Sequence, residues 1–119
     1  MPKIDLIDPY RVSGPYPAHS FLVDGVWPRG LTKEKLTGVE WLKTVAPSRE
    51  LRQWFHQNRD QWETFKKRYE KELESSPDWQ PLLQRLRAGE SLALLTGNKD
   101  QTHNQAVVLR DFLLMKLAR

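Results

Sequence analysis

Two short segments of the sequence carry most of the side chains that could bind a ligand or transfer a proton. Residues 24–30 read Asp-Gly-Val-Trp-Pro-Arg-Gly, and residues 96–104 read Thr-Gly-Asn-Lys-Asp-Gln-Thr-His-Asn. Each segment follows a short apolar run of strand type, at residues 21–23 and 91–96. In open α/β sheets, ligands bind beyond the carboxyl ends of the strands. We therefore expect a binding site where these two segments meet, with 96–104 as the better candidate.

The segment 96–104 offers groups that suit an anion. It leads into a predicted helix, and the free N–H groups and positive dipole end of a helix N-terminus attract negative charge. Lys99 adds a cation, and Gly97 allows a close approach of the backbone to a ligand. Histidine is the residue type best suited to exchange a proton near neutral pH, so His103 is the best candidate for a catalytic acid or base.

Each of these residues also has a structural interpretation. Asp100 closes a turn, or it pairs with Lys99 or with the helix dipole. Asn104 satisfies a neighbouring loop carbonyl, and His103 is a polar surface residue. Thr102 and Gln105 have the spacing of a helix-capping box, which needs no ligand.

The segment 24–30 contributes Asp24 and Arg29. Arg29 either forms a structural ion pair with Asp24 or binds an anionic ligand, because a guanidinium group matches both kinds of partner. Arg52 lies near the start of a predicted helix, and its side chain reaches the same cleft or only the solvent.

Several common signatures of chemistry are missing from the sequence. It contains no GxGxxG motif, no P-loop, no GxSxG nucleophile elbow and no HExxH zinc motif. The chain has no Cys, and its His residues, His19, His56 and His103, are widely separated. The sequence therefore predicts no metal site, and it identifies no cofactor.

Composition places the chain among soluble globular proteins. It has 119 residues, 39% hydrophobic and 29% charged, with a net charge of +4. No stretch approaches the ~18 apolar residues of a membrane helix, and the first residues lack an apolar run of signal-peptide type. We expect a single domain, residues 1–119, in the cytoplasm and without a membrane partner.

Hydrophobic periodicity predicts a small α/β domain. The alternating segment 4–7 and the apolar runs at 21–23 and 91–96 predict strands, and a parallel sheet suits the long helical connection before the last of them. The expected fold is a small, largely parallel sheet with helices packed on it, although the connection 8–20 could make an antiparallel neighbour. Helices are predicted at about 39–45, from 48, from 60, from 77 and from about 103 to the C-terminus.

Two other function classes remain open at this stage. The basic run Lys66-Lys67-Arg68 and a pI near 9.5 are compatible with a nucleic-acid-binding module, which would place Arg59 and Arg85 on the same surface. An interaction protein without a ligand would instead have Asp24, Arg29, Lys99 and Asp100 in one closed network.

The sequence also resembles a known family. Residues 22–31, Leu-Val-Asp-Gly-Val-Trp-Pro-Arg-Gly-Leu, are similar to the LVDRxWPRGL signature of the YeaO-like bacterial proteins, a domain of unknown function numbered 488. The similarity runs on through nearly the whole chain and closes with Lys99-Asp100, His103-Asn104 and residues 106–109. The resemblance implies a single α/β domain, and it draws attention to the residues in signature blocks: Asp24, Trp27, Arg29, Arg52, Tyr69, Lys99, Asp100, His103 and Asn104.

The chain departs from the family pattern at two places in the expected cleft. Gly25 stands where the family usually has Arg, and Thr96-Gly97-Asn98 stands where it usually has Tyr-Ala-Ala. If the family shares an activity, these changes alter or abolish it in this chain.

The leading hypothesis is binding of an anionic, phosphorylated small ligand, with enzymatic activity left open. Arg29 and Lys99 would hold the negative charge with the N-terminus of the last helix. The candidate ligand-binding residues are Asp24, Arg29, Arg52, Lys99, Asp100, His103 and Asn104. The oligomeric state is open.

Overall fold

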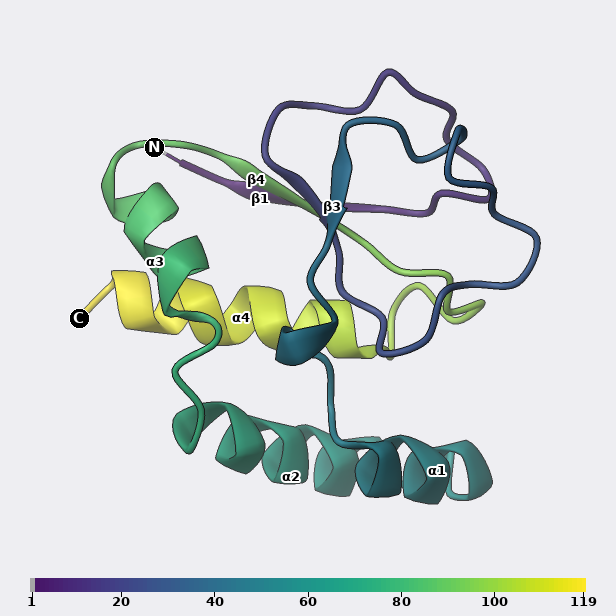
Figure 1. Ribbon diagram of the computed structural model, residues 1–119. Helices are drawn as coiled ribbons and strands as arrows, with labels where there is room; N and C mark the ends of the chain where they lie inside the picture. Colours follow the sequence, from purple (N-terminus) through teal and green to yellow (C-terminus); the bar gives the residue numbers. More distant parts are fainter. Residues whose placement is uncertain (1) are drawn as a thin grey trace.

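Four short strands form one parallel sheet with the spatial order β1-β4-β2-β3 (Figure 1). The computed structural model describes residues 2–119. The strands are β1 (Ile4–Ile7), β2 (Ser20–Leu22), β3 (Val39–Trp41) and β4 (Leu92–Leu95). The α/β fold expected from the sequence is confirmed. β1 and β2 are not neighbours, because β4 lies between them, so the connection 8–20 makes no antiparallel pair.

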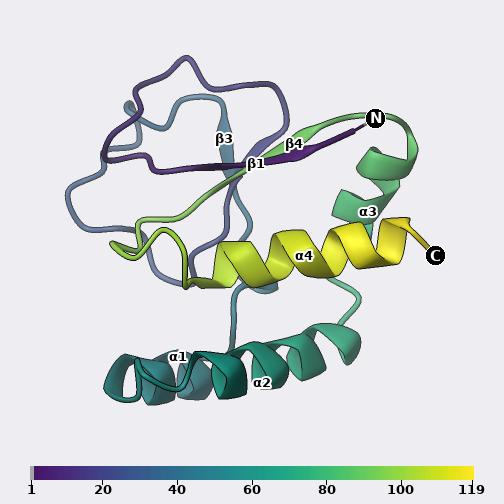
Figure 2. The same ribbon diagram turned by 180° about the vertical axis from the view of Figure 1, so that it is seen from behind.

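The helices all lie on one side of the sheet. They are α1 (Arg49–Gln57), α2 (Trp62–Glu74), α3 (Gln80–Arg87) and α4 (Gln105–Leu117). Figures 1 and 2 show α4 beneath the sheet, with α1 and α2 on the far side of α4. Because α4 packs between two layers, it is apolar around most of its circumference. No helix within residues 2–119 combines the length and apolar character needed to cross a bilayer.

The opposite face of the sheet is covered by loops. Successive strand residues point to opposite faces, so Phe21 and Leu94 join the helical core while Leu22 and Leu95 join a second cluster. The loop residues that pack against this second cluster are Tyr16, Trp27, Leu31 and Leu36. The segments after β1 and β2 therefore both cover the sheet and lead to its carboxyl edge.

Three sequence predictions about local structure are wrong. The helix expected from 77 begins only at Gln80, the first residue of α3. The expected helix at 39–45 is β3 followed by a 3-10 turn, η1 (Lys43–Val45), because Ser20, Phe21 and Leu22 provide an edge on which 39–41 can pair. The last helix begins at Gln105 rather than near 103. Its cap is Asn104, whose side chain accepts a hydrogen bond from the Val107 N–H at 3.1 Å.

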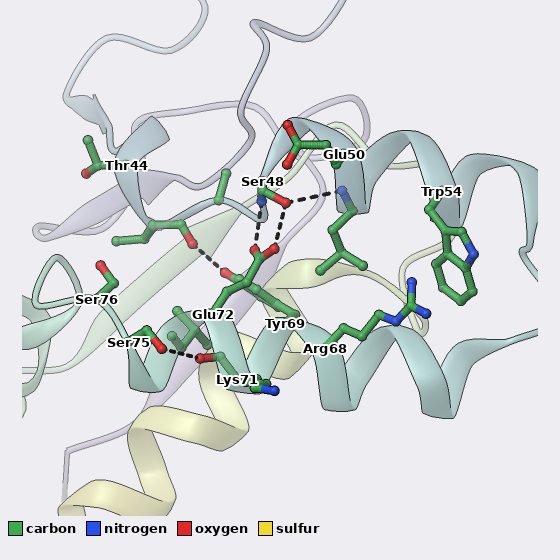
Figure 3. Close-up of a pocket in the computed structure, with 14 residues that line it drawn as sticks. Thr44, Ser48, Glu50, Trp54, Arg68, Tyr69, Lys71, Glu72, Ser75 and Ser76 are labelled. Atoms are coloured by element: carbon green, nitrogen blue, oxygen red, sulfur yellow. Dashed lines mark hydrogen bonds between the residues drawn. The ribbon is translucent and has the colours of Figure 1, made fainter.

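The start of α1 is tied to the C-terminal half of α2 (Figure 3). Ser48 caps α1, and its N–H and hydroxyl donate to the Glu72 carboxylate at 2.8 and 2.6 Å. The fully buried Tyr69 donates its hydroxyl to the Val45 carbonyl at the end of η1. Burial raises the pKa of the Tyr69 phenol, which therefore stays a donor at neutral pH. These bonds fix the direction in which α1 leaves β3.

Replacing Tyr69 by Phe should destabilise the fold by about 1–3 kcal/mol, because the Val45 carbonyl loses its donor in a buried place. Urea unfolding measures the loss as a lower midpoint at constant slope. Tyr16→Phe is the matched control. It removes a 2.7 Å bond to the Val12 carbonyl that lies at the surface, where water can replace the hydroxyl. Equal losses in the two variants would contradict this account.

Candidate functional site

All four strand-end loops meet around one cavity of about 370 Å³. Its walls come from Tyr10 after β1, residues 24–26 and 28–29 after β2, Pro47 after η1 and residues 96–98 after β4. Because the strands are parallel, their carboxyl ends share one edge of the sheet. The cavity, which we name the arginine cavity, also receives three basic side chains: Arg29, Arg52 and Arg59.

Asp24 holds the loops of this edge together. Its Oδ1 accepts hydrogen bonds from the Thr96 hydroxyl and the Gln105 amide, both at 2.5 Å, and its Oδ2 accepts from the Gly97 N–H at 2.8 Å. The Asp24 backbone carbonyl also accepts from the Trp41 indole N–H at 2.7 Å. One residue thus connects the end of β2 to β3, to the β4–α4 loop and to the first residue of α4.

Both oxygens of the Asp24 carboxylate already accept hydrogen bonds within the protein. Burial raises the pKa of its carboxyl group, and the hydrogen bonds from Thr96, Gly97 and Gln105 oppose that rise, with a smaller opposing effect from the charge of Arg52. Among residues 2–119, Asp24 forms no ion pair with Arg29, so the structural Asp24–Arg29 pair considered from the sequence is wrong. Asp24 organises the cavity wall and leaves Arg29 unneutralised.

Arg52 reaches the cavity rather than the open solvent. It projects from the first turns of α1, whose direction is fixed at Ser48, and its guanidinium lies against the backbone of Gly25. Its Nε is buried and has no hydrogen-bond partner in the part of the chain that the structure describes. A buried donor without an acceptor is costly, and no carboxylate that the structure describes forms an ion pair with this guanidinium.

Sequence reasoning missed two further residues of this wall, His56 and Arg59. Arg52 and His56 are four residues apart, which places them on one face of α1, and Arg59 follows in the turn after the helix ends at Gln57. Arg59 lies over the ring of Phe55 at 5.6 Å from its centroid. The helical spacing from Arg52 could have found His56, whereas Arg59 lies beyond the helix and no such pattern marks it.

A second cavity of about 530 Å³ adjoins the first and contains the other predicted cation. We name it the lysine cavity, since Lys99 lines it together with Arg29 and Arg11. The structure therefore brings Arg29 and Lys99, seventy residues apart in the chain, to one hollow. The closed network expected of a protein without a ligand is wrong, because two open cavities adjoin Arg29.

Asp100 and Asn104 line neither cavity. Asp100 accepts hydrogen bonds through its Oδ1 from the N–H groups of Thr102 and His103 and from the Thr102 hydroxyl, each at 3.0 Å. The N–H of Thr102 is the main cause that lowers the pKa of the Asp100 carboxyl to about 2. Asn104 caps α4 and donates to the Asp100 carbonyl at 2.8 Å. Both residues build the turn before α4, and a ligand role for them stays a sequence prediction.

His103 also lies outside both cavities. Its ring meets Trp62 edge-on with centroids 5.1 Å apart, and its Nδ1 lies 3.4 Å from the Asp100 carboxylate. These contacts join the turn before α4 to α2. A catalytic role for His103 stays a prediction, and no reacting partner faces it from the cavities.

A groove of about 900 Å³ between α1 and α2 is larger than either cavity (Figure 3). Its central polar groups are paired with one another: Glu72 binds Ser48, and Tyr69 binds the Val45 carbonyl. Arg68 stacks on Trp54 at 4.4 Å from the ring centroid. These pairs link the two helices, so we place the candidate site at the strand ends.

The basic residues proposed for nucleic-acid binding have separate environments. Arg85 on α3 contacts Glu90 at 3.2 Å and His19 at 3.0 Å, Arg59 faces the arginine cavity, and Arg68 stacks on Trp54. Nucleic-acid binding stays a prediction. Within residues 2–119, no group of three acidic, His or Cys side chains lies close enough together to hold a metal ion.

Comparison with known proteins identifies the family. Residues 4–119 match the family model described as the inactive DUF488-N3 subclade. The chain belongs to the YeaO-like DUF488 family. It is 38% identical over 106 residues to the uncharacterized protein YeaO of Escherichia coli (strain K12), covering 89% of this chain and 90% of that protein.

Two mycobacterial proteins are also similar. The uncharacterized proteins Mb3100c of Mycobacterium bovis and Rv3073c of Mycobacterium tuberculosis are each 32% identical to this chain over 104 residues. The matched residues are 87% of this chain and 87% of each relative. No solved structure matches the chain.

The departures from the DUF488 pattern have clear structural effects. Gly25 leaves room for Arg52, since a Cβ there would lie 3.0 Å from its Cζ and Nε. Thr96 supplies the hydroxyl that binds Asp24. Gly97 admits Pro28, because a Cβ at 97 would lie 2.5 Å from the Pro28 Cβ. The substituted residues therefore fit together as one arrangement of the cavity wall.

Replacing Gly97 by Ala should destabilise the protein by about 1–3 kcal/mol, because its methyl group would overlap Pro28 and force the two loops apart. Thermal and urea unfolding measure the loss. Gly25→Ala is the matched control, since its methyl group would meet only the movable end of Arg52. A Gly97→Ala variant as stable as Gly25→Ala would show that the loops are not tightly apposed.

Asp100 should make stability depend on acid pH. Its folded pKa of about 2 lies below the usual value for Asp, so its contribution is present above pH ~4 and is lost as the pH falls towards 2. Asp100→Asn keeps an oxygen for the three donors but removes the charge. Urea unfolding at several pH values should show the parent more stable at pH 6, with the difference shrinking towards pH 2.

Asp111→Asn controls for the loss of a carboxylate, because Asp111 lies on the exposed face of α4. A difference between the parent and Asp100→Asn that does not change with pH would contradict the role given to the turn before α4.

Proposed function

We propose that this protein binds a small anionic ligand, of the phosphorylated class, in the arginine cavity. The observation that carries the proposal is Arg52 at the cavity wall, whose guanidinium forms no ion pair and whose buried Nε has no acceptor within residues 2–119. Arg29 and Arg59 line the same space. Guanidinium groups present forked donors that match phosphate or carboxylate oxygens.

The charge balance of the cavity supports an anion. The one acidic side chain in its wall is Asp24, whose oxygens already accept from Thr96, Gly97 and Gln105. In the part of the chain that the structure describes, Arg29, Arg52 and Arg59 form no ion pairs. An anionic ligand would neutralise cations that the protein itself leaves unpaired.

The proposal is for binding and not for catalysis. Asp24, the carboxylate nearest the cations, is held by three donors, so it is poorly placed to take up a proton from a substrate. His103, the predicted acid or base, lines neither cavity. The description of the matching family model as inactive agrees with this limit.

The test is a thermal-unfolding titration with inorganic phosphate at constant ionic strength. A ligand at ten times its Kd adds about 1.4 kcal/mol, which corresponds to roughly 5 °C for a domain of this size. Arg52→Gln should lose most of that shift while keeping its unliganded melting temperature within a few degrees, because Gln retains much of the side-chain stem.

The control is Lys67→Ala, which removes one positive charge from an exposed position on α2 outside both cavities. Its phosphate response should equal that of the parent. If Arg52→Gln and Lys67→Ala respond alike, or if the parent shows no response, the site does not bind phosphate and the proposal fails.

A further inference from the structure

The arginine and lysine cavities have a wall in common. Tyr10, Arg29, Gly97 and Asn98 line both of them. Contacts within this wall hold it together. The Tyr10 hydroxyl donates to the Arg29 carbonyl, and Pro28 and the Tyr10 ring pack against Gly97, which has no Cβ. A single molecule could therefore contact both cavities around a fixed partition.

Cations lie on each side of that partition. Arg52 and Arg59 belong to the arginine cavity alone, and Lys99 and Arg11 belong to the lysine cavity alone. Arg11 is balanced by Asp8 at 3.7 Å, whereas Lys99 forms no ion pair within residues 2–119. The unpaired positive charges therefore lie in two separate cavities instead of in a single one.

We infer that the ligand carries two anionic groups, one for each cavity. Arg52 and Arg59 would hold the first group, Lys99 would hold the second, and Arg29 would lie between them. This inference rests on the proposed function and specifies its ligand class as a small molecule with two separate phosphate or carboxylate groups. A ligand with one anionic group would leave one set of cations without a partner.

Linking two anionic groups should raise affinity, because the second contact becomes intramolecular once the first has formed. The probes are methylphosphonate, with one anionic group, and methylene-, ethylene-, propylene- and butylene-bisphosphonate, with two groups at increasing separation. Succinate and glutarate in the same series distinguish carboxylate from phosphate recognition. Isothermal titration calorimetry at fixed ionic strength measures each Kd.

We expect one bisphosphonate or dicarboxylate to bind at least about tenfold more tightly than methylphosphonate, with an optimum at one linker length. Arg59→Ala and Lys99→Ala should each reduce its affinity to near that of the one-group probe. For methylphosphonate, one of the two variants should have no effect, because its cation faces the other cavity. Both side chains are exposed, so the fold should tolerate their removal.

Lys67→Ala again controls for the loss of one positive charge and should leave every Kd unchanged. Equal affinity for methylphosphonate and the two-group probes, or losses confined to one of the two variants for all probes, would overturn the two-anion ligand while leaving anion binding intact. Binding of no probe would remove both the two-anion ligand and the proposed function.

Discussion

The half-buried carboxylate of Asp24 makes the interactions on which the carboxyl edge of the sheet depends. Its two oxygens accept from the β4–α4 loop and from α4, and its backbone carbonyl accepts from Trp41. Burial alone would favour the neutral acid, and the surrounding donors act against that tendency. These hydrogen bonds fix the end of β2. They also occupy the oxygens of Asp24, the acidic side chain that lines the cavity together with three arginines. The positive character of the cavity therefore follows from how the fold satisfies one carboxylate.

The position of Arg52 depends on a second set of contacts, between the segment after β3 and α2. Ser48 caps α1 and binds Glu72, while Tyr69 binds the carbonyl before that cap. These bonds set the direction of α1, and α1 carries Arg52 to the backbone of Gly25. The hydrogen bonds that line the groove between α1 and α2 thus also shape the arginine cavity. By orienting α1, they place the cation of Arg52 at the edge of the sheet.

The sequence predicts most of the fold but only part of the site. Alternation identifies β1, and apolar runs identify β2 and β4, because a strand covered on both faces is largely apolar. The pattern at 39–45 fits a helix equally well, and only the free edge of β2 decides for a strand there. Arg29 and Lys99 are found because both follow strands. His103 and Asn104 are misleading because the same residue types occur in catalytic sites and at helix starts. Tertiary contacts distinguish the two uses, and they leave no local sequence pattern; the edge-on packing of His103 against Trp62 is an example.

The loops over the second face of the sheet have an evolutionary consequence. The chain that shields Leu22 and Leu95 from water, including Trp27 and Leu31, continues directly into the residues that surround the cavities. Sequence changes around the cavities must therefore also preserve the cover over these apolar strands. Insertions or deletions near Trp27 would risk exposing those strands and causing aggregation, so diversification should proceed mainly by point replacements such as those at positions 25 and 96–98.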